Sequence, residues 1–357
     1  MKRRTFLEVM SATAASTVLA PGLAAASPRA GFRAWTWVHG DSTESLQQWR
    51  DRFARFRAGG ISGVVVGGGA TALIAEAAHA EGMSFHAWAW MLNRSGDSWV
   101  QAKFPEWFDV SRKGESSLTH QPYVGYYKWL CPTRPEVREY LGGLVKEIAQ
   151  TPGVEGVHLD YIRHPDVILP RGLWDTYKLV QDHEMPEYDF CYCAVCRDTF
   201  KQQSGYDPLS LADPTADRAW REFRWNSITQ VVRELAATVR SHNRLISAAV
   251  FPTPTLARMQ VRQAWDQWPL DMVFPMTYHK FHNQGISWIG DAVREGVAAI
   301  PAMQPLFAGL HLPDLDPPSL VYAVNTARAA GAAGVSLYDS GSLSDAHLAA
   351  LKWVVDG

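Results

Sequence analysis

Two ionisable side chains, His158 and Asp160, lie within an apolar run at residues 156–162. A β-strand there would place both on one face, because side chains alternate along a strand. A buried carboxylate is costly unless it is paired or used, and catalytic groups gather at the carboxyl ends of parallel barrel strands. We therefore predict that Asp160 is catalytic. The alternative is that Asp160 pairs with Arg163 or caps the following loop.

The four cysteines are the second group with a defined chemistry. Cys191, Cys193 and Cys196 form a C-x-C-x-x-C triplet, and Cys131 precedes a predicted helix. Closely spaced thiolates converge on one tetrahedral ion but pair poorly with each other. We predict a structural zinc site with these four ligands. Two disulfides, which are usual in exported proteins, are the alternative.

A glycine run at residues 67–69 loosely fits a dinucleotide-binding loop. Such a site also needs an acid at the end of the next strand to hold a ribose, and the next predicted strand lacks one. We interpret the glycines as a tight turn and expect no organic cofactor.

Short apolar runs alternate with helical patterns from residue 32 to the C-terminus. The predicted strands are residues 32–38, 63–66, 84–92, 156–162, 245–251, 271–278, 298–306 and 334–338. Helices are predicted at residues 43–58, 71–80, 135–150 and 219–241. Eight such units predict an α/β fold, a (β/α)8 TIM barrel with a long insertion after strand 4. A doubly wound open sheet is the alternative.

The N-terminus has the features of an export signal. Residues 1–26 combine the pair Arg3-Arg4, a short apolar run and a small-residue cleavage site, which is typical of a twin-arginine-type signal peptide. We expect residues 27–357 to form a single domain that is exported by the twin-arginine route and is periplasmic or extracellular. The apolar run is too short for a membrane anchor, so we expect no stable membrane span after signal cleavage. The formal net charge of −2 gives no indication of nucleic acid as a partner.

Residues 130–138, 154–165 and 268–278 resemble the family 10-like glycosyl hydrolases, a bacterial group with a (β/α)8 catalytic domain. The resemblance covers most of the mature chain and is most specific around Asp160. It implies a glycoside hydrolase that acts on a poly- or oligosaccharide.

The cysteines resemble a different group, the family 42 β-galactosidases, in which such a set binds structural zinc. Those enzymes carry an Asn-Glu pair at strand 4, whereas this chain has Leu159-Asp160. Neither their acid/base assignment nor their galactose specificity is therefore implied.

Glycoside hydrolysis requires two carboxyl groups across the scissile bond. Asp339 follows the eighth predicted strand and is our first candidate for the catalytic partner of Asp160, with a turn or capping role equally open. Glu184, Glu187 and Asp189, in the loop before the cysteine triplet, are further candidates.

Aromatic and polar side chains near the strand ends are predicted to bind the carbohydrate substrate, because aromatic faces stack on sugar rings and polar groups bind hydroxyls. These residues are Trp37, Trp88, Trp90, His158, Arg163, Tyr278 and His279. Two alternatives stay open. Since no acid follows strands five and six, the chain could be a catalytically inactive carbohydrate-binding envelope protein. His158 and Asp160 could also belong to a catalytic metal site for deacylation or amide hydrolysis.

Overall fold

The computed structural model describes residues 31–356, and residues 32–356 belong to one compact unit. The predicted signal peptide, residues 1–26, lies outside the described residues. Among residues 31–356, no helix has the length and apolar character needed to cross a membrane.

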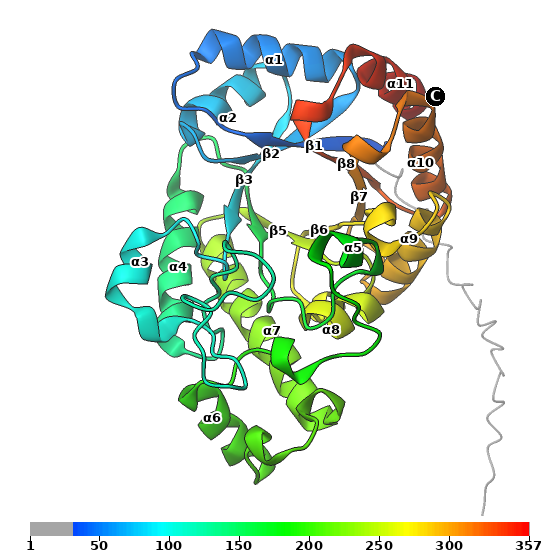
Figure 1. The fold of residues 1–357 in the computed structure, drawn as a ribbon. Coiled ribbons are helices and arrows are strands. Elements are labelled where there is room, and N and C mark those ends of the chain that lie inside the picture. The colour runs from blue at the N-terminus through cyan, green and yellow to red at the C-terminus, as the bar shows by residue number, and fades with distance from the viewer. Residues whose placement is uncertain (1–30, 357) are drawn as a thin grey trace, which may run out of the picture. The chain divides into compact units, whose positions relative to one another are not determined.

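Eight parallel strands form the centre of the fold (Figure 1). They are β1 (Arg33–His39), β2 (Ile61–Gly67), β3 (Ser84–Trp90), β4 (Gly156–Asp160), β5 (Leu245–Val250), β6 (Met272–Pro275), β7 (Phe307–His311) and β8 (Gly334–Tyr338). Their order in the sheet is β6-β5-β4-β3-β2-β1-β8-β7. A parallel bridge between Val273 and Leu306 links β6 to the residue before β7, so the sheet is a nearly closed barrel. The predicted (β/α)8 TIM barrel is confirmed.

The helices are α1 (Leu46–Ala58), α2 (Thr71–Ala80), α3 (Ser98–Lys103), α4 (Pro135–Gln150), α5 (Trp174–Tyr177), α6 (Ala194–Ser204), α7 (Arg218–Ser241), α8 (Pro254–Val261), α9 (Trp288–Ala299), α10 (Pro317–Ala329) and α11 (Asp345–Asp356). Most of them lie on the outer side of the barrel, whereas the short α5 lies in front of the strands (Figure 1). The local sequence specifies where several of these helices begin. Ser45 and Gln48 form a capping box at α1, and Pro135 occupies the first turn of α4, where its missing N–H is no loss.

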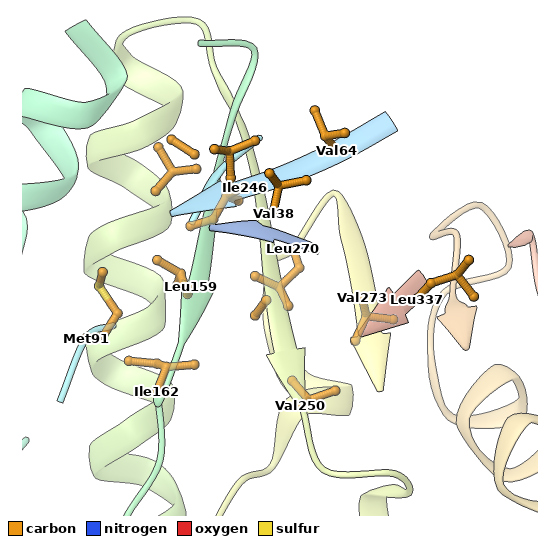
Figure 2. Close-up of a cluster of buried hydrophobic side chains, with 14 of the residues drawn as sticks. Val38, Val64, Met91, Leu159, Ile162, Ile246, Val250, Leu270, Val273 and Leu337 are labelled. Carbon is orange, nitrogen blue, oxygen red and sulfur yellow. The ribbon is translucent and has the colours of Figure 1, made fainter. Parts of the chain in front are cut away.

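The outward-facing strand residues pack under these helices. Figure 2 shows Leu159, Ile246, Val273 and Leu337, from β4, β5, β6 and β8, in one buried apolar cluster. Burial of such side chains stabilises the barrel by about 1.5–3 kcal/mol per residue. The inward-facing positions are therefore free to carry polar groups.

Bulky rings fill the inside of the barrel, and glycines on the neighbouring strands make room for them. A Cβ atom added at Gly63 of β2 would lie 2.6 Å from the ring of Trp35 on β1. One added at Gly156 of β4 would lie 2.4 Å from the ring of His86 on β3. Since Trp35 and His86 are both buried, neither ring has space to withdraw.

This packing predicts opposite effects for one substitution at two glycines. Gly63→Ala forces a methyl group into the Trp35 ring, so we expect the free energy of unfolding to fall by about 1–3 kcal/mol. Gly143→Ala is the control, because Gly143 lies exposed within α4 and its Cβ would meet nothing within 4 Å. It should raise stability by up to about 1 kcal/mol. Urea unfolding of both variants measures the difference, and equal effects would contradict this packing.

One predicted strand is wrong. Residues 298–306 were expected to form the seventh strand, but they contain the end of α9 and a loop, and β7 is Phe307–His311. Short apolar runs fit helix and strand equally well. Pro301 and Pro305 within this run lack the N–H that a central strand donates, which excludes the predicted position.

Candidate active site

A cavity of about 380 Å³ lies at the carboxyl ends of the strands. Its lining comes from strand ends and from the segments that follow β3, β4, β5 and β6. Aromatic residues dominate this lining, which consists of Trp37, Trp88, Trp90, Tyr126, Tyr127, Asp160, Tyr161, Arg163, Asp166, Pro170, Leu173, Tyr177, Phe251, Pro252, Met276, Tyr278, Phe281, His282, His311 and Tyr338. Such a surface suits a ligand with flat apolar faces and several hydroxyl groups.

Asp160 is the last residue of β4, and its carboxylate accepts two hydrogen bonds. Oδ1 accepts from the backbone N–H of Tyr161 at 2.7 Å, and Oδ2 accepts from the indole N–H of Trp88 at 3.0 Å. Tyr161 has a left-handed backbone conformation (φ 47°), which ends the strand here rather than at residue 162 as expected.

Burial raises the pKa of Asp160 above its usual value, although both hydrogen bonds and the nearby Arg163 lower it. The carboxyl group therefore keeps its proton to a higher pH than an exposed aspartate does, as a proton donor must.

The guanidinium of Arg163 pairs with Asp166 rather than with Asp160. Nη1 of Arg163 lies 3.0 Å from Oδ2 of Asp166, which also accepts a hydrogen bond from the Tyr127 hydroxyl at 2.9 Å. Burial lowers the pKa of Arg163, but Asp166 and the neighbouring tyrosines outweigh it and hold that pKa above its ordinary value. Asp166 is the second carboxylate in the cavity lining, after Asp160. It was not predicted from the sequence as a site residue, although it lies only six residues after Asp160.

Five of the seven predicted substrate-binding residues line the cavity: Trp37, Trp88, Trp90, Arg163 and Tyr278. His158 lies one inward position deeper in the barrel, where Nδ1 bonds the Ser247 hydroxyl at 2.8 Å. Burial lowers the pKa of His158 well below its usual value, so its ring is neutral. His279 is also buried, at the start of a 3₁₀ turn, and is not part of the lining.

Asp339 lies beside the cavity rather than in its lining. Its Oδ1 accepts from the backbone N–H of Gly341 at 2.9 Å, so Asp339 caps a 3₁₀ turn, and its Oδ2 lies 3.5 Å from Nε2 of His39. Tyr338 is near both predicted catalytic residues. Burial raises the pKa of Tyr338 most, and the charges of Asp160 and Asp339 raise it further.

The acids of the loop before the cysteine triplet have other roles. Glu184 pairs with Arg262 at 2.6 Å, and the fully buried Asp189 pairs with Arg224 at 2.7 Å. Glu187 is exposed. None of the three lines the cavity.

Sequence reasoning missed the contribution of β7. Phe307, Gly309 and His311 alternate with the outward-facing Ala308 and Leu310, so His311 points inward at the carboxyl end. This period of two is visible in the sequence. It was missed because the seventh strand was placed nine residues too early.

The four cysteines converge in a second buried site that could bind a metal. Their sulfur atoms all lie within 4.8 Å of one another, with Cys131 Sγ 3.3 Å from Cys196 Sγ and 3.7 Å from Cys193 Sγ. All four are free thiols. Zn–S bonds of about 2.3 Å place the sulfurs of a tetrahedral site about 3.8 Å apart, close to these separations.

Backbone groups already point at the sulfur of Cys191. The N–H groups of Val110 and Cys193 donate to Cys191 Sγ at 3.2 and 3.4 Å. Burial raises the pKa of the Cys131 and Cys191 thiols, so a bound metal ion must displace protons from them. Within residues 31–356 this is the one cluster of three or more metal-binding side chains, and neither His158 nor Asp160 belongs to it.

Solved structures with this fold include several glycoside hydrolases. The glycoside hydrolase domain of PgaB (BpsB) from Bordetella bronchiseptica matches 91% of this chain and 99% of its own, with a TM-score of 0.65 and 15% identity. The catalytic domain of β-amylase from Paenibacillus polymyxa matches 91% of this chain and 97% of its own, with a TM-score of 0.63 and 10% identity.

A third, the α-L-fucosidase isoenzyme 2 from Paenibacillus thiaminolyticus, matches 92% of this chain and 49% of its own, with a TM-score of 0.57 and 14% identity. No protein-family model and no curated protein sequence matches the chain. The comparisons therefore show that the chain shares a (β/α)8 fold with glycoside hydrolases.

Proposed function

We propose that the protein is an exported glycoside hydrolase that cleaves a poly- or oligosaccharide, with Asp160 as its essential acid. The observation that carries the proposal is a carboxyl group of raised pKa at the carboxyl end of a barrel strand, facing an aromatic cavity. The family 10-like motifs around Asp160 and the glycoside hydrolases of similar fold support it.

The geometry suits proton donation to a leaving oxygen. The protonated carboxyl of Asp160 transfers its proton to the glycosidic oxygen as the bond to the anomeric carbon breaks. The N–H groups of Tyr161 and Trp88 then stabilise the carboxylate that remains. The rings of Trp37 and Tyr338 lie in the same lining and offer apolar surface to the sugar.

The proposal includes a structural zinc ion held by Cys131, Cys191, Cys193 and Cys196. Four thiolates complete a tetrahedral site and leave no position for a reacting water, so the ion would stabilise the fold rather than act in catalysis. Cys131 lies four residues before the start of α4, Cys193 is the N-cap of α6, and Cys196 lies in the first turn of α6, so the ion would join two segments far apart in the chain. Twin-arginine export of an already folded protein is consistent with zinc loading before export.

The test is the release of reducing ends from bacterial-envelope glycans and from plant and microbial polysaccharides by the purified mature protein. We expect cleavage of at least one class, and the Asp160→Asn variant should not cleave it. If the wild type binds a glycan but cleaves none, the proposal fails and the inactive carbohydrate-binding protein takes its place.

A prediction about pH follows from the contact between Trp88 and Asp160. Trp88→Phe removes a hydrogen bond that lowers the pKa of Asp160, so that pKa rises further. If Asp160 acts as an acid, the alkaline limb of kcat/KM moves to higher pH. Trp90→Phe is the control, because Trp90 lines the same cavity without bonding Asp160. A shift of equal size in both variants would contradict the assignment.

A further inference from the structure

Resting on the proposed hydrolase function, we infer that His311, oriented by Asp314, is the base that activates the attacking water. His311 ends β7, and Asp160 ends β4. Two strands, β5 and β6, separate β4 from β7 around the barrel. Both side chains line the same cavity, so a sugar bound there can contact both.

The hydrogen bond to Asp314 determines which ring nitrogen of His311 is basic. Nδ1 of His311 donates to Oδ2 of Asp314 at 2.8 Å, and a carboxylate accepts only, so Nδ1 carries the proton. Nε2 therefore presents a lone pair. Within residues 31–356, no side chain or backbone group bonds Nε2 of His311, although the ring lines the cavity. A base held in one tautomer by a carboxylate is the arrangement that water activation requires.

The surroundings of His311 hold that orientation. Lys280 Nζ lies 3.4 Å from Oδ1 of Asp314, so this ion pair holds the carboxylate beside His311. His279, on the same turn as Lys280, is a further titratable neighbour of His311. Burial lowers the pKa of His279, Asp314 raises it, and the charges of Lys280 and His311 lower it further. The other titratable neighbours are Tyr278, with its ring centroid 5.3 Å from that of His311, and Tyr338, at 6.4 Å.

From the sequence, a carboxylate was expected in this role, but the other proton-exchanging groups in or near the cavity suit it less well than His311. Oδ2 of Asp166 accepts hydrogen bonds from both Arg163 and Tyr127, so this carboxylate belongs to a buried ion pair. His282 stacks on Trp288, with ring centroids 5.0 Å apart, and burial lowers its pKa to about 4, which makes it a weak base. Asp339 does not line the cavity.

The step balances with water as the only co-reactant. A water oxygen bonds to the anomeric carbon as Nε2 of His311 takes one proton from it. Asp160 gives its proton to the glycosidic oxygen, and the bond between that oxygen and the anomeric carbon breaks. Solvent then returns a proton to Asp160 and removes one from His311. Because water attacks directly and opposite the leaving group, the product has inverted stereochemistry.

The test compares His311→Gln and Asp314→Asn with the wild type on a cleaved glycan. We expect kcat to fall by about 100-fold or more in each, with KM nearly unchanged. The control is His183→Gln, which removes a histidine that pairs with Asp182 at 2.6 Å but is exposed and outside the cavity.

Two measurements keep the inference falsifiable if a variant is unstable. NMR of ¹⁵N-labelled wild type should show an unprotonated Nε2 in His311, and the anomeric proton spectrum of the first product should show inversion. Three results would overturn the inference while Asp160 stays essential. They are a product with retained stereochemistry, a protonated Nε2 in His311, and near-normal turnover in His311→Gln together with an inactive Asp339→Asn variant. Absence of any cleavage by the wild type overturns the proposed function as well.

Discussion

Asp160→Asn is expected to lower kcat on a cleaved glycan by about 10²–10⁴-fold and to leave binding of the same glycan within a few-fold of wild type. The amide has the shape of the carboxyl group but no proton of suitable acidity for the leaving oxygen. Turnover and isothermal titration with an oligosaccharide measure the two effects. Asp291→Asn, at an exposed aspartate outside the cavity, is the control and should keep full activity.

The same variant should change how stability depends on pH. Because burial raises the pKa of Asp160 above its usual value, the folded protein binds this proton more tightly than the unfolded chain does. The free energy of unfolding therefore decreases as pH rises from the unfolded to the folded pKa of this group. The Asn variant lacks this decrease, so its stability relative to wild type should improve from acidic to neutral pH. Urea unfolding at several pH values measures this, and parallel pH profiles would contradict a raised pKa.

Removal of the proposed zinc ion is expected to have the largest effect on stability. Structural zinc contributes on the order of 10 kcal/mol in small domains, so chelation or Cys131→Ser should cost several kcal/mol here. The sulfurs lie in a buried cluster with Phe190, Trp220 and other residues that do not line the cavity. The protein that stays folded should therefore keep its kcat.

Elemental analysis should find one zinc ion per chain, and the ion should dissociate as pH falls, because protons compete for the buried thiolates. Thr133→Val is the matched control: it removes a hydroxyl 3.2 Å from Cys196 Sγ but keeps all four sulfurs, so zinc should remain bound. Destabilisation by a reductant but not by a chelator, with no metal present, would support the disulfide alternative instead.

The sequence predicted the barrel because its elements are local. The helix at residues 71–80 and the helix at residues 135–150 have the predicted bounds, since apolar periodicity and, in the second, an N-terminal proline define them. The seventh strand was misplaced because the apolar character of residues 298–306 outweighed the two prolines that exclude a central strand there. The observed β7 follows directly after this run.

Within the cavity, the sequence indicated the aromatic and acidic residues at the ends of strands, such as Trp90 and Asp160. It could not indicate contacts that depend on loops. The pairing of Arg163 with Asp166 arises from a backbone turn at Tyr161, and the bond from His311 to Asp314 requires the position of β7 to be known. Likewise, the pairing of Glu184 with Arg262 joins residues 78 apart in the sequence.

The central claim, that Asp160 donates a proton to the leaving oxygen, is tested most directly by varying the leaving group. Kinetics of wild type and Asp160→Asn are compared on aryl glycosides of the sugar that is cleaved. A dinitrophenolate departs without protonation, so the loss caused by Asp160→Asn should shrink to within about tenfold, from 10²-fold or more on an alkyl or sugar leaving group. An equal loss on both substrates, or no loss on either, would contradict the role assigned to Asp160.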